Sequence, residues 1–193
     1  EVEVPNLDFT GWYDHCNGTM QHLPRMQRTG GTETARKGTR LVIGPWNHPC
    51  IGQRRVGDLD FGLQAELDRT DVMIRWFDHW LKGCDNGVDR EKPVRYFIMG
   101  ANKWRGAETW PPEDLSETVY HLSSHGDADA AGGSGLLTRN VPSDEPCDTF
   151  TYDAKDPVPT LWTEALFTVP SDRRILENRQ DILYYRTPSL QEN

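Results

Sequence analysis

An aspartate and a histidine stand 34 positions apart in this 193-residue sequence, each a few residues beyond a segment with the pattern of a β-strand. Asp14 ends the stretch GWYD, and His48 ends the stretch GPWNH. A carboxylate that accepts the Nδ1–H of an imidazole fixes its tautomer and stabilises the imidazolium that forms when the other nitrogen takes a proton. The two residue types could therefore act as the acid and base of a catalytic triad, provided that the fold brings them together.

Both residues also have ordinary roles that involve no catalysis. An aspartate after a strand is commonly a turn residue or a helix N-cap, and a histidine in a loop is commonly only solvated. The spacing by itself leaves both interpretations open.

Two predicted strands must position the pair. One strand covers residues 6–11, and the other is the apolar segment Leu41–Ile43. Between them, residues 18–28 are loosely amphipathic and predict a short helix interrupted near Pro24, whereas residues 28–39 are polar and glycine-rich, as in a surface loop. If the two strands are parallel, their carboxyl ends lie at one edge of the sheet, where ligands bind.

The clearest secondary-structure signal is a helix predicted for Ala65–Lys82. Apolar side chains recur on one face at helical spacing, namely Met73, Trp76, Phe77, Trp80 and Leu81. Acidic residues in the first turns and a lysine in the last suit the helix dipole. Gly83 is the predicted C-cap.

The sequence changes character after a turn-rich polar link at residues 83–93. From there it predicts short strands separated by long loops, at residues 94–99, 119–122, 148–153 and 181–187. The boundary between an α/β part and an all-β part is therefore predicted near residues 84–92.

Composition excludes some classes of partner. The formal net charge of −9 and the pI of about 5.1 argue against nucleic acid and anionic membranes, which require basic surfaces. No apolar run approaches the roughly 20 residues of a membrane helix. The four cysteines lie far apart, which favours free thiols, although their even number leaves disulfides open. The sequence does not identify a compartment, and the cytoplasm is slightly favoured.

Other residues with metal-binding or nucleophilic chemistry occur in weaker patterns. His121 and His125 have the spacing of a zinc pair on a helix, but they span a strand end and a loop and lack a third ligand. Cys50 follows His48 without a clear activating neighbour, and a structural role is favoured for His79 in the predicted helix. The stretch CDNGVD lacks the full spacing of a calcium loop and is interpreted as a turn.

Several stretches occur in the order found in one known family: GWYD, GPWNH, DLDFG, IRWFDHWLKG and PVRYFIMGANKWRGAETWPP. Together they resemble the cocaine esterase / X-prolyl dipeptidyl-peptidase family of α/β-hydrolase serine hydrolases. The stretches DTFTYDAKDPVPT and ENRQDILYYRT resemble parts of the β-domain of the same proteins. In that family the aspartate of GWYD and the histidine of GPWxH are the acid and base of the triad, and they match Asp14 and His48.

The resemblance implies a fold and a reaction. Residues 1–86 would be the C-terminal part of an α/β-hydrolase domain, with parallel strands and helices. Residues 93–193 would be the N-terminal part of a jelly-roll, galactose-binding-like β-sandwich. The implied activity is hydrolysis of ester, acyl-amide or X-Pro dipeptidyl substrates through an acyl-enzyme, without a cofactor.

The family's nucleophile is missing from the expected position. It is a serine in a G-x-S-x-G-like elbow that precedes the aspartate in the chain. No serine stands among the 13 residues before Asp14, and Ser134 in GGSGL lacks the second glycine at the right place and lies in the wrong domain. We therefore expect an internal part of a longer enzyme, with the serine outside this chain and no triad-dependent hydrolysis by this chain alone.

The expected partners are small-molecule esters or amides or short peptides, with no nucleic acid and no membrane; a homo-oligomer is compatible with the sequence. The alternative is a non-catalytic fragment or a β-sandwich binding module, because the chain lacks its nucleophile.

Overall fold

The computed structural model describes residues 2–129, 132–161 and 170–189. The chain divides into two compact units, Glu1–Leu115 with Thr163–Ser171 and Ser116–Trp162 with Asp172–Asn193. No helix among the described residues is long and apolar enough to cross a membrane. The cysteines are free thiols at Cys16, Cys50, Cys84 and Cys147.

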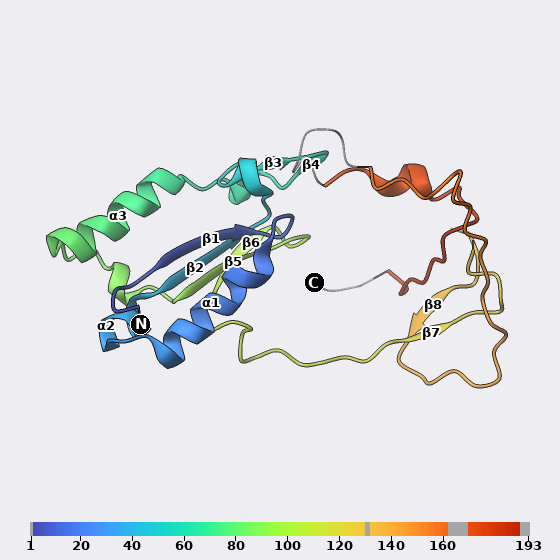
Figure 1. Cartoon of the computed structure of the whole chain (residues 1–193), viewed down its shortest axis with the longest axis horizontal. Coiled ribbons are helices and arrows are strands. Elements are labelled where there is room, and N and C mark those ends of the chain that lie inside the picture. The colour runs from blue at the N-terminus through green and yellow to red at the C-terminus, as the bar shows by residue number, and fades with distance from the viewer. Residues whose placement is uncertain (1, 130–131, 162–169, 190–193) are drawn as a thin grey trace. The chain divides into compact units, whose positions relative to one another are not determined.

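A four-stranded sheet with the strand order β1-β2-β5-β6 forms the centre of the first unit (Figure 1). Its strands are β1 (Leu7–Gly11), β2 (Arg40–Gly44), β5 (Val94–Ile98) and β6 (Lys103–Ala107). β1, β2 and β5 run parallel, and β6 is antiparallel to β5. The sheet is therefore mixed.

Three helices and several short elements connect these strands. The helices are α1 (Cys16–Thr29), α2 (Glu33–Gly38) and α3 (Arg69–Lys82). The short elements are the 3-10 turns η1 (His48–Cys50), η2 (Leu63–Ala65) and η3 (Val88–Arg90) and the hairpin of β3 (Arg55–Val56) with β4 (Leu59–Asp60).

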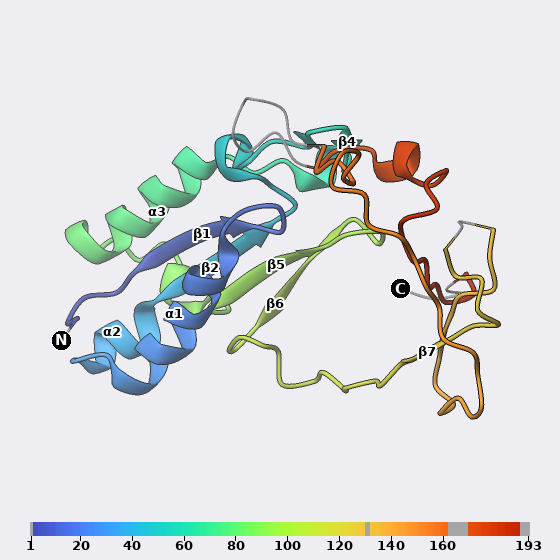
Figure 2. The same cartoon turned by 45° about the vertical axis from the view of Figure 1, so that its right-hand side comes forward.

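Apolar side chains pack on both faces of the sheet. Leu41 and Ile43 of β2 pack with Leu23 of α1 on one face, whereas Val42 packs with Phe97 on the other. Figure 2 shows α1 and α3 on opposite sides of the sheet. Every residue of β2 is buried, which explains why Leu41–Ile43 is a continuous apolar run rather than an alternating pattern.

The predicted helix before the domain link is confirmed, with a later start. α3 begins at Arg69 rather than at Ala65, because the side chain of Asp68 accepts the N–H of Asp71 at 3.0 Å and caps the helix. Gly83 ends the helix in the left-handed conformation, with φ of 70°.

The segment between β1 and β2 is more helical than the sequence predicted. α1 is assigned as helical without a break across Pro24, where an interruption was expected. The predicted surface loop at residues 28–39 contains α2, whose N-cap Thr32 accepts the N–H of Ala35 at 3.0 Å. The glycines around it obscured this local capping signal.

β5 and β6 belong to the first sheet. The sequence predicted a boundary near residues 84–92 and placed Val94 onward in the all-β part. In the structure, Leu41 of β2 pairs with Val94, and the contacts divide between Leu115 and Ser116. β6 itself lies in a segment that was expected to be a loop. Pairing between strands far apart in the sequence leaves no local pattern.

The second unit contains an antiparallel pair of strands, β7 (His121–Ser123) and β8 (Leu136–Thr138), and a 3-10 turn, η4 (Arg173–Leu176). The predictions of strands at residues 148–153 and 181–187 are wrong. The first segment has no strand, and the second contributes an isolated bridge between Arg186 and Leu136. The alternating residues Phe150 and Tyr152 are exposed, so the apolar side chains of that pattern do not pack against a sheet of the described residues.

A carboxylate ties three parts of this second unit together. Asp148 accepts hydrogen bonds from the Ser124 hydroxyl at 2.6 Å, from the Ala128 N–H at 3.0 Å and from the Tyr185 hydroxyl. These bonds lower the pKa of Asp148, and the bond to the carboxylate raises the pKa of Tyr185 to about 12.

Candidate active site

The carboxyl ends of β1 and β2 carry the two residues singled out from the sequence. In the parallel register, Gly11 at the end of β1 lies opposite Gly44 at the end of β2. Asp14 follows β1 by three residues, and His48 opens η1 four residues beyond β2. The loops therefore leave neighbouring strands at the same edge of the sheet, as the sequence predicted.

The structure brings the two side chains into contact. Nδ1 of His48 lies 3.2 Å from Oδ2 of Asp14, and the other carboxylate oxygen accepts the main-chain N–H of His15 at 2.7 Å. The Asp14 side chain is only 10% exposed, whereas that of His48 is 65% exposed. A shielded carboxylate thus faces one nitrogen of an accessible imidazole, which is the geometry that fixes a histidine tautomer.

Two buried residues before His48 hold the turn that carries it. The side chain of Asn47, which is 2% exposed, accepts the N–H of Cys50 at 3.1 Å and caps η1. Trp46 before it is fully buried. His48 is therefore presented by a short capped turn on a buried anchor.

An aromatic side chain stands beside the aspartate. Tyr13 packs on Phe61 with ring centroids 6.2 Å apart, and its hydroxyl lies 3.5 Å from the sulfur of Met99. Burial raises the pKa of the Tyr13 phenol. The side chain before Asp14 is therefore a half-buried phenol that stays uncharged near neutral pH.

A second histidine–aspartate pair was not anticipated from the sequence. Nδ1 of His22 in α1 lies 2.7 Å from Oδ2 of Asp8 in β1, and the side chain of Asn6 donates to the other oxygen at 2.8 Å. The His22 side chain is 36% exposed. The pair fastens α1 to the strand that leads to Asp14, and no sequence spacing indicated it.

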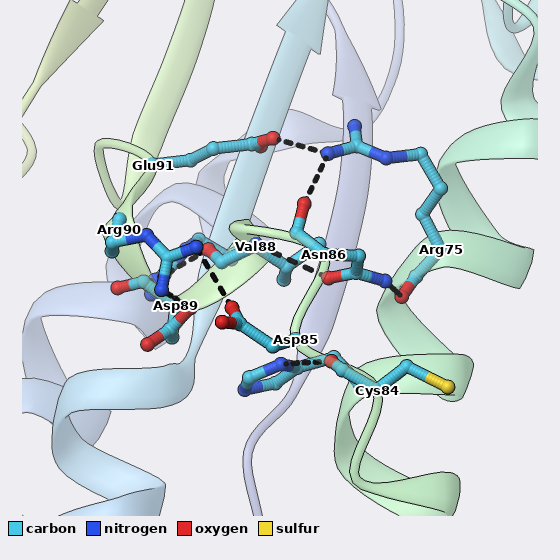
Figure 3. A network of polar contacts seen from close by, with 10 residues as sticks. Arg75, Cys84, Asp85, Asn86, Val88, Asp89, Arg90 and Glu91 are labelled. Atoms are coloured by element: carbon cyan, nitrogen blue, oxygen red, sulfur yellow. Dashed lines mark hydrogen bonds and ion pairs between the residues drawn. The ribbon is translucent and has the colours of Figure 1, made fainter.

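The stretch CDNGVD after α3, which the sequence predicted to be a turn, is held by ion pairs and hydrogen bonds of two arginines. Figure 3 shows Arg75 of α3 reaching both the carboxylate of Glu91 and the main chain of Asn86, while Arg90 pairs with Asp85. These arginines neutralise the carboxylates of the turn. The described residues contain no group of three or more His, Cys, Asp or Glu side chains placed to hold a metal ion.

The remaining candidates occupy ordinary positions. His79 donates from Nδ1 to the carbonyl of Cys84 at 3.0 Å and packs edge-on against Trp80, which is a structural role. His121 lies in β7, and His125 lies in the turn beyond it.

Comparison with known proteins identifies the class. Residues 86–193 match the family described as the X-Pro dipeptidyl-peptidase C-terminal non-catalytic domain, which is more than half of the chain. A protein of Streptomyces avermitilis whose name proposes a Xaa-Pro dipeptidyl-peptidase is 35% identical over 100 residues, covering 52% of this chain and 13% of that protein. These relatives place the chain in a family of hydrolases.

The whole chain aligns with a further relative. The protein named cocaine esterase from Rhodococcus sp. (strain MB1 Bresler) is 33% identical over 196 residues, which cover 98% of this chain and 33% of that protein. The chain belongs to the cocaine esterase / X-Pro dipeptidyl-peptidase family, as the ordered stretches predicted.

A solved structure shares the fold. The aminopeptidase from a marine sediment Thaumarchaeota archaeon matches with a TM-score of 0.64 and 24% identity, over 93% of this chain and 30% of that chain. The present chain therefore spans about a third of the length of this protein and of the cocaine esterase.

Proposed function

We propose that the chain supplies the acid and base of a serine-hydrolase triad within a longer protein. Asp14 orients His48 and stabilises its charged form, and the nucleophilic serine lies in polypeptide outside residues 1–193. The observation that carries the proposal is the 3.2 Å contact between Oδ2 of Asp14 and Nδ1 of His48, made by loops from neighbouring parallel strands. We refer to the longer protein as the intact protein.

The pair would act through the second imidazole nitrogen. With its proton held on Nδ1 by Asp14, His48 accepts the serine hydroxyl proton on Nε2 while the serine oxygen attacks the substrate carbonyl. The imidazolium then returns that proton to the leaving alcohol or amine, which yields the acyl-enzyme. In the second half, His48 takes a proton from water as the water oxygen attacks the acyl carbon, and it then returns that proton to the serine oxygen as the acid is released. No step requires a cofactor.

An uncovered apolar groove supports placing the first unit in a larger α/β-hydrolase domain. The groove has a volume of about 680 Å³ and lies between the segment Glu3–Phe9 and α3. On α3, Phe77 is 43% exposed and Leu81 is 76% exposed. Within the described residues, β1 is an edge strand that pairs with β2 alone. Further polypeptide that continues the sheet beyond β1 would bury this surface, and burial of apolar area is the main favourable term in folding.

The second half of the chain is proposed to have no catalytic residue. Residues 86–193 match a domain described as non-catalytic. That match agrees with the position of both candidate residues before it, and it favours the alternative of a binding module for the second unit alone.

The proposed substrates are esters, acyl amides or X-Pro peptides. Relatives are named for cocaine ester cleavage and for Xaa-Pro dipeptidyl-peptidase activity. All of these reactions transfer an acyl group to a serine and then to water, so one triad serves each of them.

The test compares two histidine variants of the intact protein. We expect His48→Ala to reduce kcat for p-nitrophenyl ester hydrolysis by several orders of magnitude, because the serine then has no base. His22→Ala is the matched control, since it removes a second histidine that pairs with an aspartate and leaves the side chains of Asp14 and His48 in place. Near-normal turnover in His48→Ala, or an equal loss in both variants, would show that His48 is not the base. A fluorophosphonate probe that fails to label the intact protein would exclude the serine mechanism.

A further inference from the structure

We propose that Gly11, Gly44 and Trp46 form a main-chain clamp that sets the separation of Asp14 and His48, so that these three act as positioning residues. The catalytic consequence rests on the proposed function, whereas the clamp itself rests on the geometry of the two loops.

Two hydrogen bonds extend the pairing of β1 and β2 beyond the ends of the strands. The N–H of Trp12 donates to the carbonyl of Gly44, and the N–H of Tyr13 donates to the carbonyl of Trp46, each at 3.0 Å. Tyr13 immediately precedes Asp14, and Trp46 stands two residues before His48. The second bond therefore fixes the spacing of the two loops immediately before Asp14 and His48 in the chain.

Only glycine leaves room for this approach. A Cβ at Gly11 would lie 2.1 Å from the carbonyl oxygen of Trp46, and a Cβ at Gly44 would lie 2.3 Å from the indole ring of Trp46. The first contact is with main chain, which cannot move aside without breaking the bond from Tyr13. A single methyl group at Gly11 would thus push the loops apart without removing any functional group.

The indole anchors the clamp in the core. Trp46 is fully buried and packs with Val42, Phe97 and Trp104, the last with ring centroids 5.7 Å apart. Its indole N–H has no hydrogen-bond partner among the described residues. The side chain therefore acts through its shape, and a phenylalanine would keep a ring over Gly44 without losing a hydrogen bond to a described residue.

The first test is Gly11→Ala in the intact protein, with Gly18→Ala as the matched control. A Cβ at Gly18, in α1, meets nothing within 4 Å. For Gly11→Ala we expect kcat to fall about 10- to 100-fold with KM little changed, because a displacement of about 1 Å in reacting groups has effects of this size. We expect Gly18→Ala to keep the kcat of the parent.

A second readout does not depend on hydrolysis. In protein with ¹⁵N-labelled histidine, the Nδ1–H proton of His48 is assigned by its loss in His48→Ala. We expect this signal to shift or broaden in Gly11→Ala and to stay in place in Gly18→Ala. A general loss of stability would not move it selectively, and near-ultraviolet circular dichroism verifies that the variants are folded.

Substitutions of Trp46 decide the matter if Gly11→Ala does not fold. Trp46→Phe should lower kcat by less than about threefold, whereas Trp46→Ala should lower it about 10- to 100-fold at a temperature where it is folded. A folded Gly11→Ala or Trp46→Ala protein with the parental kcat and the parental His48 signal would overturn the clamp. If His48→Ala keeps its activity, the proposed function fails, but the His48 Nδ1–H signal in Gly11→Ala still tests the clamp.

Discussion

Replacing Asp14 by asparagine changes one atom of the site and reverses the hydrogen-bonding demand on His48. One carboxylate oxygen accepts the N–H of His15 at 2.7 Å, and the other faces Nδ1 of His48 at 3.2 Å. In the variant, the amide oxygen must stay against the His15 N–H, because an NH₂ group there would face another donor. The amide NH₂ then points at Nδ1, which must accept, and the imidazole proton moves to Nε2. That tautomer cannot take a proton from a serine.

The size of the effect follows from the distance and the exposure. A carboxylate and an imidazolium 3.2 Å apart attract by about 5 kcal/mol at an effective dielectric constant of about 20, and by about 1 kcal/mol in bulk water. Asp14 is 10% exposed and His48 is 65% exposed, so the pair lies between these limits. The variant loses this attraction and also holds His48 in the wrong tautomer. We therefore expect kcat of the intact protein to fall about a thousandfold, which is about 4 kcal/mol in activation free energy.

The assay is steady-state hydrolysis of a p-nitrophenyl ester, with kcat and KM measured separately. KM should change little, because Asp14 is not expected to touch the substrate. Asp8→Asn is the matched control, since Asp8 also pairs with a histidine, His22, at 2.7 Å. A loss of less than about tenfold in Asp14→Asn, or an equal loss in Asp8→Asn, would refute the reasoning.

Three further outcomes are expected. Asp148→Asn should return the Tyr185 pKa from about 12 toward its ordinary value, measured by phenolate absorbance. In the parent, the lowered pKa of Asp148 stabilises the second unit at pH values above the ordinary carboxyl pKa. Denaturant unfolding should therefore show this contribution lost as the pH falls through the lowered pKa. Leu23→Ala should lower the free energy of unfolding by about 2–5 kcal/mol, because Leu23 is fully buried, whereas Leu63→Ala, at a site that is 66% exposed, should change it by less than about 0.5 kcal/mol; equal effects in chemical denaturation would contradict the core assignment. The 193-residue chain alone should show no hydrolysis that depends on His48, and turnover abolished by His48→Ala in this chain would contradict the external serine.

Elements with complete local signals were predictable from the sequence. α3 has an apolar face and a C-cap at Gly83, and both signals lie within a short stretch of chain. Its N-cap at Asp68 was not identified from the sequence, so the helix was predicted to begin at Ala65 rather than at Arg69. β2 contains the apolar run Leu41–Ile43 and ends at a glycine. The order of the motif stretches also indicated the family before any contact was known, since the stretches are specific together although each one alone is a weak signal.

Elements that depend on distant partners were not predictable. β6 is a short strand with a glycine in it and only one large apolar side chain, and it pairs with β5, which in turn pairs with β2. The contacts divide at Leu115 and Ser116 for the same reason, whereas the family match begins at residue 86, within the predicted boundary of residues 84–92. Conversely, the alternation around Phe150 predicted a strand that does not form, and no strand among the described residues pairs with that segment.

In the candidate site, too, the local features were predictable from the sequence and the contacts between distant residues were not. The sequence by itself determined that Asp14 and His48 follow two strands, and that glycines stand at the ends of those strands. The parallel register of Gly11 with Gly44, and the hydrogen bond from Tyr13 to Trp46, were decided only by the tertiary structure. A residue's type and its neighbours in the chain are local properties. The 3.2 Å distance between the Asp14 carboxylate and the His48 imidazole depends instead on how the sheet, the helices and the buried indole pack together.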